Sequence, residues 1–265
     1  MRSAVLYSFA PAVVALCALS ASSCTAGGGD LKSLEARPQP PGNPIANQIA
    51  EGKRIANDAT LRARGVVVVA VDTYDETMDG KGVGDVFVQD PIQEGAKGTP
   101  YSALRLYRPT KAPPDLRLLP GQWVEVVGPF TAFTGPPGSP PFDGGVTSSQ
   151  VANGALTLVG EGAEPEPVEL TYDDVKDPKT AMPYFSRLVR IRNVPIMDAF
   201  SVTRPEAPIF TADRNGLKLT SKFFAIHDTK GLDVSKGKKL KSVVGILDFF
   251  YTVKLCPRTV ADIEP

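Results

Sequence analysis

The sequence predicts a mainly β protein with two tandem β-domains behind an N-terminal export segment. Glycine and proline together make up 49 of the 265 residues, about 18% against roughly 12% in an average protein, and this excess interrupts long helices and favours turns. Hydrophobic residues account for 42% of the chain, which is enough apolar material for a core and argues against general disorder. From Leu61 to the C-terminus, β-branched runs alternate with Gly- and Pro-rich turns. All-α architectures are therefore disfavoured.

The charge and the metal-binding residue types argue against several function classes. The 29 basic residues balance the 29 acidic ones, whereas a domain that binds polyanions in general is usually clearly basic. One histidine and three cysteines leave too few soft ligands for a zinc or iron–sulfur site, so we expect no metal and no cofactor. The acidic loop from Asp72 to Asp79 leaves calcium binding open as an alternative, although its spacing differs from that of an EF-hand.

Residues 1–23 are predicted to be a signal peptide. Arg2 gives a positive start, residues 10–19 form an apolar stretch too short to span a bilayer, and small residues lead up to Cys24. This junction resembles the lipobox of bacterial lipoproteins, although Ala21 stands where that family prefers leucine. The resemblance implies that Cys24 is lipidated and anchors the protein in the bacterial cell envelope. Thr25, in place of the aspartate that signals inner-membrane retention, implies the outer membrane. Ordinary signal-peptidase cleavage near the same position is the alternative.

A tether and one short helix are expected before the β-rich part. Residues 24–42 are first Gly-rich and then Pro-rich, which is the composition of a spacer. In residues 43–60, the spacing of Ile45, Ile49 and Ile55 with interleaved alanines indicates a helix.

Two residues that often carry chemistry are predicted to be structural. Cys256 lies in the β-like run YTVKLCPR, where a small buried hydrophobic residue is more common than a reactive thiol. His227 is the only histidine, lies beside Asp228, and is not accompanied by a nucleophile-elbow, zinc-protease or P-loop motif. We therefore predict that the protein is not an enzyme. A hydrolase is the least supported alternative, because the sequence offers no nucleophile and base pair for it.

An internal comparison indicates a diverged duplication. Segment 61–72 (LRARGVVVVAVD) resembles segment 187–198 (RLVRIRNVPIMD), and segment 118–130 resembles segment 234–250, with glycines before and within each strand. Two matches in the same order favour a duplication over a solenoid of short repeats. The expected boundaries follow from the Gly-, Glu- and Pro-rich composition of the middle segment: domain 1 at 61–159, linker at 160–167 and domain 2 at 168–265.

The strand succession in the first copy resembles the oligonucleotide/oligosaccharide-binding (OB) fold. The resemblance rests on the strand end from Phe87 to Asp90, on residues 101–109 and on the strand from Gly121 to Gly128, while the closing KLCPRTVADIEP of the second copy resembles the last strand and exit of such modules. In particular it is similar to OB-like modules of exported bacterial proteins and of extracellular nucleases. It implies two tandem five-stranded Greek-key barrels that bind ligands on strands 2 and 3 and on the loops between strands.

Strand alternation in the first copy predicts the binding face. Val86, Val88, Leu104 and Leu106 form one set, which is the natural core. The opposite face carries candidate residues on which bases or sugars stack: Phe87, Tyr101, Arg105 and Tyr107. The alternative is that these large side chains are covered by another element or form cross-strand pairs.

Trp123 is a further candidate for stacking, because it alternates with the inward-facing Val124. The alternative is partial burial beneath residues 131–150. That Pro- and Gly-rich segment lies between the expected strands 4 and 5, where it would frame a ligand groove.

These observations predict a non-enzymatic outer-membrane lipoprotein whose tandem OB-like barrels act as an interaction or scaffold module. It would contact the membrane through its lipid and bind a protein partner of the envelope. The alternative is an accessory module that binds nucleic acid or oligosaccharide through the strand 2 and 3 face of domain 1.

Overall fold

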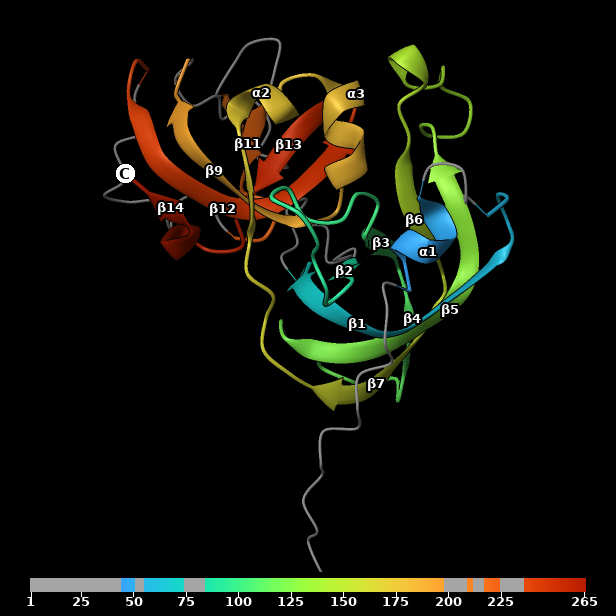
Figure 1. Cartoon of the computed structure of the whole chain (residues 1–265). Helices are drawn as coiled ribbons and strands as arrows, with labels where there is room; N and C mark the ends of the chain where they lie inside the picture. Colours follow the sequence, from blue (N-terminus) through green and yellow to red (C-terminus); the bar gives the residue numbers. More distant parts are fainter. Residues whose placement is uncertain (1–43, 51–54, 74–83, 198–208, 212–216, 225–235) are drawn as a thin grey trace, which may run out of the picture. The chain divides into compact units, whose positions relative to one another are not determined.

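Two β-sheets dominate the structure, which is a computed structural model (Figure 1). The structure describes residues 44–50, 55–73, 84–197, 209–211, 217–224 and 236–265. Both sheets belong to one compact unit, Ala36–Pro265. The predicted mainly β fold is confirmed. The predicted signal peptide (1–23), Cys24 and the tether (24–42) lie outside the described residues.

The first sheet contains a closed five-stranded barrel. Its strands are β1 (Thr60–Val71), β2 (Val86–Gln89), β3 (Ala103–Tyr107), β4 (Thr110–Ala112), β5 (Gln122–Phe133), β6 (Ser148–Ala152) and β7 (Ala155–Glu161). The ring runs β1-β2-β3-β6-β5, and β5 pairs with β1 to close it. Neighbours in the ring are antiparallel except for β3 and β6, which are parallel. Strand β7 pairs with β5, and β4 pairs with β7, so these two strands extend the sheet beyond the ring.

Aliphatic side chains fill the barrel in the predicted alternation. Val86, Val88, Leu104 and Leu106 are buried in one cluster with inward residues of β1 and β5. Strand β1 changes this alternation partway along. A bulge between Val68 and Ala70 shifts its register against β2, so that the last part of β1 turns side chains toward the second sheet.

The predicted N-terminal helix is much shorter than its expected range. Helix α1 spans Ala46–Ile49, and Ile45 and Ile49 are buried in the barrel core. Residues 57 and 58 lie in a turn, and Asp58 has a φ of 66°, which is incompatible with a continuous right-handed helix. The isoleucine spacing correctly indicated the buried face but not the helix length.

Asp90 joins α1 to the barrel. Its Oδ1 accepts a hydrogen bond from the backbone N–H of Ile45 at 2.9 Å, and its Oδ2 accepts one from Ala46 at 2.9 Å. Burial raises the pKa of Asp90 to about 6, although these two hydrogen bonds and the charge of Arg187 act in the opposite direction. The carboxyl group therefore satisfies two N–H groups that the start of the helix leaves open.

The second sheet repeats the strand order of the first. Its strands are β8 (Val168–Leu170), β9 (Leu188–Pro195), β10 (Ile209–Thr211), β11 (Lys218–Thr220), β12 (Lys239–Phe250), β13 (Thr252–Cys256) and β14 (Ile263–Glu264). Its strands follow one another in the order β10-β11-β13-β12-β9, which corresponds to β2-β3-β6-β5-β1 in the first sheet. The β11–β13 pair is parallel, as is the corresponding β3–β6 pair. Strand β8 pairs with β9, and β14 pairs with β12.

The expectation of two tandem barrels is confirmed only for the first sheet, because the second sheet is not closed within the described residues. No pairing between β9 and β10 closes it within the described residues. Strand β9 ends at Pro195, which has no N–H to donate to a neighbouring strand. Strand β10 is only three residues long, so little edge is available for a closing pair.

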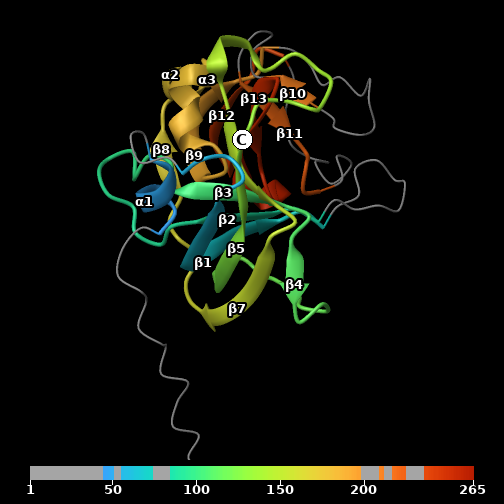
Figure 2. The same cartoon turned by 90° about the vertical axis from the view of Figure 1, so that its right-hand side faces the viewer.

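The long connection between β5 and β6 reaches the core of the second sheet (Figure 2). It contains the short 3₁₀ helix η1 (Asp143–Gly145). Phe142, just before η1, is buried with the second core and lies edge-on to Phe249, with ring centroids 4.9 Å apart. The first sheet therefore contributes part of the core beneath the second.

A short helical segment precedes β9 and was not expected from the sequence. It consists of α2 (Tyr172–Val175), α3 (Pro178–Ala181) and the 3₁₀ helix η2 (Met182–Tyr184). Thr171 and Asp174 form a reciprocal capping box at the start of α2, and Asp177 caps α3 directly before Pro178. These are recognised start signals for helices. Strand β7 continues to Glu161, which is the second residue of the predicted linker (160–167).

The two sheets share a buried cluster. Val69, Ala70 and Phe87 from the barrel pack with side chains of the second sheet, namely Leu188, Ile246 and Cys256. The Gln89 side chain also accepts a hydrogen bond from the backbone N–H of Leu188 at 3.1 Å. The predicted burial of Cys256 is confirmed, and burial raises the pKa of its thiol to about 11.

Candidate functional site

A cavity of about 590 Å³ lies between the outer face of the barrel and the second sheet. Its volume is within the range of roughly 300–1,000 Å³ typical of small-molecule sites. Strands β3 and β6 form one wall, the end of β5 and the loop after it form a second wall, and β11, β12 and β13 with the residues after β11 form a third. The lining residues are Arg105, Tyr107, Phe133, Pro136, Pro137, Gln150, Thr220, Lys222, Asp248, Phe250 and Lys254. We call this cavity the inter-sheet pocket.

Strand geometry explains which side chains face the pocket. On β3, Leu104 and Leu106 fill the barrel, so Arg105 and Tyr107 point out of it. On the second sheet, Asp248 of β12 lies directly opposite Lys254 of β13. Residues directly opposite across an antiparallel pair point to the same face, which places a carboxylate and an ammonium group together on one wall.

One ion pair lies on each side of the pocket, one within the barrel and one within the second sheet. Arg105 donates to the fully buried Asp85 through Nε at 2.6 Å, and its Nη2 also contacts that carboxylate. Lys222 Nζ lies 3.0 Å from Asp248 Oδ2, and both side chains are largely buried. Burial opposes ionisation of Asp248, but the charges of Lys222 and Arg105 outweigh this effect and hold the pKa of Asp248 well below its usual range.

Lys254 has no such partner. Its ammonium lies 5.4 Å from the ring centroid of Phe250, and no carboxylate within the described part of the chain forms an ion pair with it. Burial lowers the pKa of Lys254, and the nearby Asp248 only partly offsets this. The pocket therefore contains one lysine whose charge is not neutralised by a direct ion pair.

Aromatic rings and prolines supply the apolar part of the lining. Two guanidinium groups lie near the ring of Tyr107, that of Arg105 at 5.7 Å and that of Arg108 at 5.2 Å from the ring centroid. Phe133 and Pro136 belong to the end of β5 and the loop that follows it. The sequence predicted that this loop would frame a groove, and the structure places it at the pocket. Flat apolar walls beside cations suit a ligand that has both an apolar body and a negative charge.

Only part of the predicted stacking face reaches this pocket. Arg105 and Tyr107 line it. Phe87 points away from the barrel core as predicted, but it is fully buried, so it cannot be an exposed stacking residue. The reason is that the second sheet covers it: Phe223 packs edge-on at 5.7 Å between ring centroids, and Lys222 Nζ lies 4.9 Å from the ring.

Tyr101 and Trp123 lie elsewhere. Tyr101 precedes β3 with a φ of 55°, packs partly buried against the barrel core, and donates its backbone N–H to Pro183 O at 2.7 Å. Trp123 is partly buried, but the segment beside it is not 131–150. Its indole lies so close to Gly162 that a Cβ there would overlap the ring, because β5 pairs with β7 at this position.

The sequence reasoning missed Lys222, Asp248 and Lys254. The sequence did contain a signal for Asp248 and Lys254. Asp248 is the single carboxylate in the apolar run VVGILDFF, and Lys254 is the single charge in TVKLC. Charged residues within buried strands are usually paired or functional. Nothing local in the sequence indicated that these strands face the barrel.

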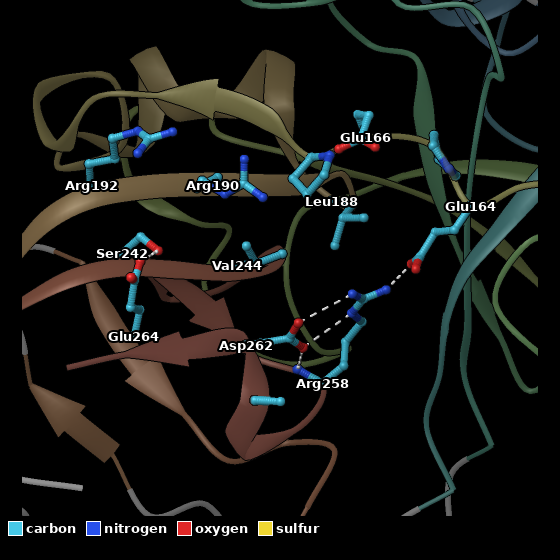
Figure 3. A pocket seen from close by; sticks show the side chains of 13 residues that line it. Glu164, Glu166, Leu188, Arg190, Arg192, Ser242, Val244, Arg258, Asp262 and Glu264 are labelled. Carbon is cyan, nitrogen blue, oxygen red and sulfur yellow. Dashed lines mark hydrogen bonds and ion pairs between the residues drawn. The ribbon is translucent and has the colours of Figure 1, made fainter.

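A second cavity, of about 660 Å³, lies at the linker and the C-terminal segment (Figure 3). Arg258 on its wall contacts the carboxylates of Glu164 and Asp262, and its Nη1 also donates to Val69 O at 3.2 Å. Arg190 and Arg192 both pair with Glu169. The cations of this cavity are therefore neutralised by the protein itself, and it is the weaker candidate for a ligand site.

Several other expectations concern metals and membranes. Within the described residues, no group of His, Cys, Asp and Glu side chains is arranged to hold a metal ion. Asp72 is buried, while Asp75, Glu76 and Asp79 of the proposed calcium loop lie outside the described residues, as do His227 and Asp228. In the described part of the chain, no helix has the length and apolar character needed to cross a bilayer.

Comparison with known proteins identifies no relative: no protein-family model, no curated protein and no solved structure matches the chain.

Proposed function

We propose that this protein is a non-enzymatic binding module of the bacterial cell envelope that holds a small ligand in the inter-sheet pocket. In this proposal, residues 1–23 direct export, Cys24 is lipidated in the outer membrane, and residues 24–42 tether the β-rich part to the lipid. Ligand binding would in turn serve an interaction or scaffold role with an envelope protein.

The observation that carries the binding role is the composition of the inter-sheet pocket. Two β-sheets contribute to it, its walls combine aromatic rings with three cations, and its volume is about 590 Å³. Pockets that bind small molecules share this combination of apolar lining and a few polar groups.

The strand topology supports assignment of the barrel to the OB-like class. A five-stranded partly open Greek-key barrel that presents a ligand face on strands 2 and 3 is the definition of that class, and β1, β2, β3, β5 and β6 form a five-stranded ring with one parallel pair. We propose that the second sheet is a diverged copy of the same module, since its strands follow the same order.

The alternative function, binding of nucleic acid or oligosaccharide, is restricted to a smaller ligand face than the sequence predicted. With Phe87 covered by the second sheet, Arg105 and Tyr107 remain as the accessible part of the predicted face. They suit a single terminal sugar or base rather than a strand lying across several stacked rings.

Binding of an uncharged apolar probe tests the proposed pocket. N-phenyl-1-naphthylamine fluoresces when it enters an apolar site, and we expect it to bind the full-length protein. Tyr107→Ala and Phe250→Ala should each weaken binding about tenfold. Tyr251→Ala is the matched control, because Tyr251 is exposed at the adjacent turn and does not line the pocket. No binding to the wild type, or equal binding by all three variants, would overturn the proposal.

The proposed lipidation of Cys24 requires a separate test. Incorporation of radiolabelled palmitate into the wild type but not into Cys24→Ala is the expected result. Equal labelling of both proteins, or labelling of neither, would refute lipidation at this cysteine.

A further inference from the structure

We propose that the ligand of the inter-sheet pocket is a small amphipathic monoanion, whose negative group binds Lys254 and whose flat apolar body lies against Tyr107 and Phe250. This inference rests on the proposed binding function and adds the chemical class of the ligand.

The charged side chains that line the pocket favour a negatively charged ligand. Three cations, Arg105, Lys222 and Lys254, line it. Two carboxylates neutralise the first two of them, because Asp85 pairs with Arg105 and Asp248 pairs with Lys222. Among the described residues, Lys254 is the one of these three cations that forms no direct ion pair with a carboxylate. An unpaired charge that is partly removed from water is unfavourable unless a partner compensates it, and a negative ligand would supply that partner.

The position of Asp248 limits how much negative charge the ligand can carry. Its carboxylate lies directly across the strand pair from Lys254 and is held ionised by Lys222 and Arg105. A second negative charge on the ligand would face this carboxylate without another unpaired cation among the described lining residues to balance it. Like charges brought together in a partly buried site repel each other strongly, so a monoanion fits and a polyphosphate does not.

The apolar lining defines the rest of the ligand. Phe250 lies 5.4 Å from the Lys254 ammonium, so the negative group and an adjoining apolar body would be contacted by neighbouring side chains. Tyr107, Phe133 and Pro136 provide further flat surfaces. Inorganic phosphate or another bare anion would leave these surfaces in contact with water and would gain nothing from them.

Two fluorescent probes that differ by one charged group test this inference. 1-Anilinonaphthalene-8-sulfonate is N-phenyl-1-naphthylamine with an added sulfonate, so the pair isolates the contribution of a single negative charge. We expect the full-length wild type to bind the sulfonate at least tenfold more tightly than the neutral probe. This ratio requires no mutation and therefore does not depend on the folding of any variant.

Variants at Lys254 then assign the charge effect to this residue. Lys254→Met should weaken sulfonate binding about tenfold and leave the neutral probe within twofold, while Lys254→Arg should retain sulfonate binding. Lys239→Met is the matched control, since it removes the same charge from an exposed position on β12 and should change neither affinity.

The outcomes separate this inference from the proposed function. Equal affinity for the two probes, or sulfonate binding that survives Lys254→Met, would refute the monoanion inference while pocket binding stands. Failure of the neutral probe to bind the wild type would refute the proposed function itself.

Discussion

Replacing Phe87 with alanine should destabilise the protein strongly, because Phe87 is a central contact between the two sheets. Its side chain is fully buried and packs with Val69, Leu188 and Ile246. Removal of a buried phenylalanine side chain costs about 3–5 kcal/mol, which includes the cavity left behind. The edge-on contact with Phe223 argues for the middle of this range, so we expect the free energy of unfolding to fall by about 4 kcal/mol.

Urea unfolding followed by the fluorescence of Trp123, the only tryptophan, measures this effect. With a dependence on urea of about 2–3 kcal/mol per molar, the midpoint should fall by roughly 1.5 M. Phe87→Leu preserves most of the volume and should cost less than about 1.5 kcal/mol. Phe250→Ala is the control for loss of an aromatic ring at an exposed position and should cost less than about 1 kcal/mol.

A different result is expected if Phe87 does not pack between the two sheets. If Phe87 were an exposed stacking residue, Phe87→Ala would reduce probe binding and leave stability within about 1 kcal/mol of the wild type, as is usual for surface positions. That combination would show that the second sheet does not pack over Phe87.

Three further predictions concern buried polar groups. Because the folded pKa of Asp90 is raised from 3.8 to about 6, its contribution to stability is greatest below pH 3.8 and is lost as the pH rises through 6. Chemical unfolding at pH 4 to 7 should therefore show a loss on the order of 3 kcal/mol from this group, and this loss should be absent in Asp90→Asn. An unchanged pH profile in the variant would contradict the prediction. In a Cys17→Ser/Cys24→Ser background, Cys256 should not react with Ellman's reagent at pH 8 until urea unfolds the protein, since burial raises the pKa of its thiol to about 11; rapid reaction in native buffer would refute its burial. Arg258→Met removes the hydrogen bonds to Val69, Glu164 and Asp262 and should lower the free energy of unfolding by about 1.5–3 kcal/mol; a urea midpoint equal to that of the wild type would show that this contact does not contribute.

Strand positions were largely predictable because they depend on local patterns. Segments 61–72 and 187–198, matched in the sequence, coincide closely with the equivalent strands β1 and β9. Segments 118–130 and 234–250 overlap the equivalent strands β5 and β12. The predicted inward set on β2 and β3 is also correct. A period of two residues identifies the two faces of a strand, whichever element lies beyond them.

The candidate site was predicted only in part, because it depends on packing between distant segments. Alternation correctly placed Phe87 and Tyr107 on the outer face, but it could not indicate that Phe223 would cover the first and leave the second beside a cavity. Arg187 shows the same limit. A basic residue before a strand is usually exposed, yet this one is fully buried and donates to Thr99 O at 3.0 Å and to Gln93 Oε1 at 2.5 Å.

Some missed elements did have a signal in the sequence. Thr171 and Asp174 have the spacing of a capping box, and Asp177 followed by Pro178 is a typical helix start. The β-rich character of the surrounding chain outweighed these local signals in the prediction.

Phe142 shows that the second sheet does not form its core alone. It belongs to the connection between two strands of the barrel, yet its ring is packed among Phe249, Phe250 and Tyr251 of the other sheet. A sheet that obtains part of its interior from a connection of its neighbour has no complete interior of its own. The second sheet thus depends on the barrel for part of its core, and a chain cut within residues 162–167 should yield a C-terminal fragment that gains structure only when it is mixed with the N-terminal one.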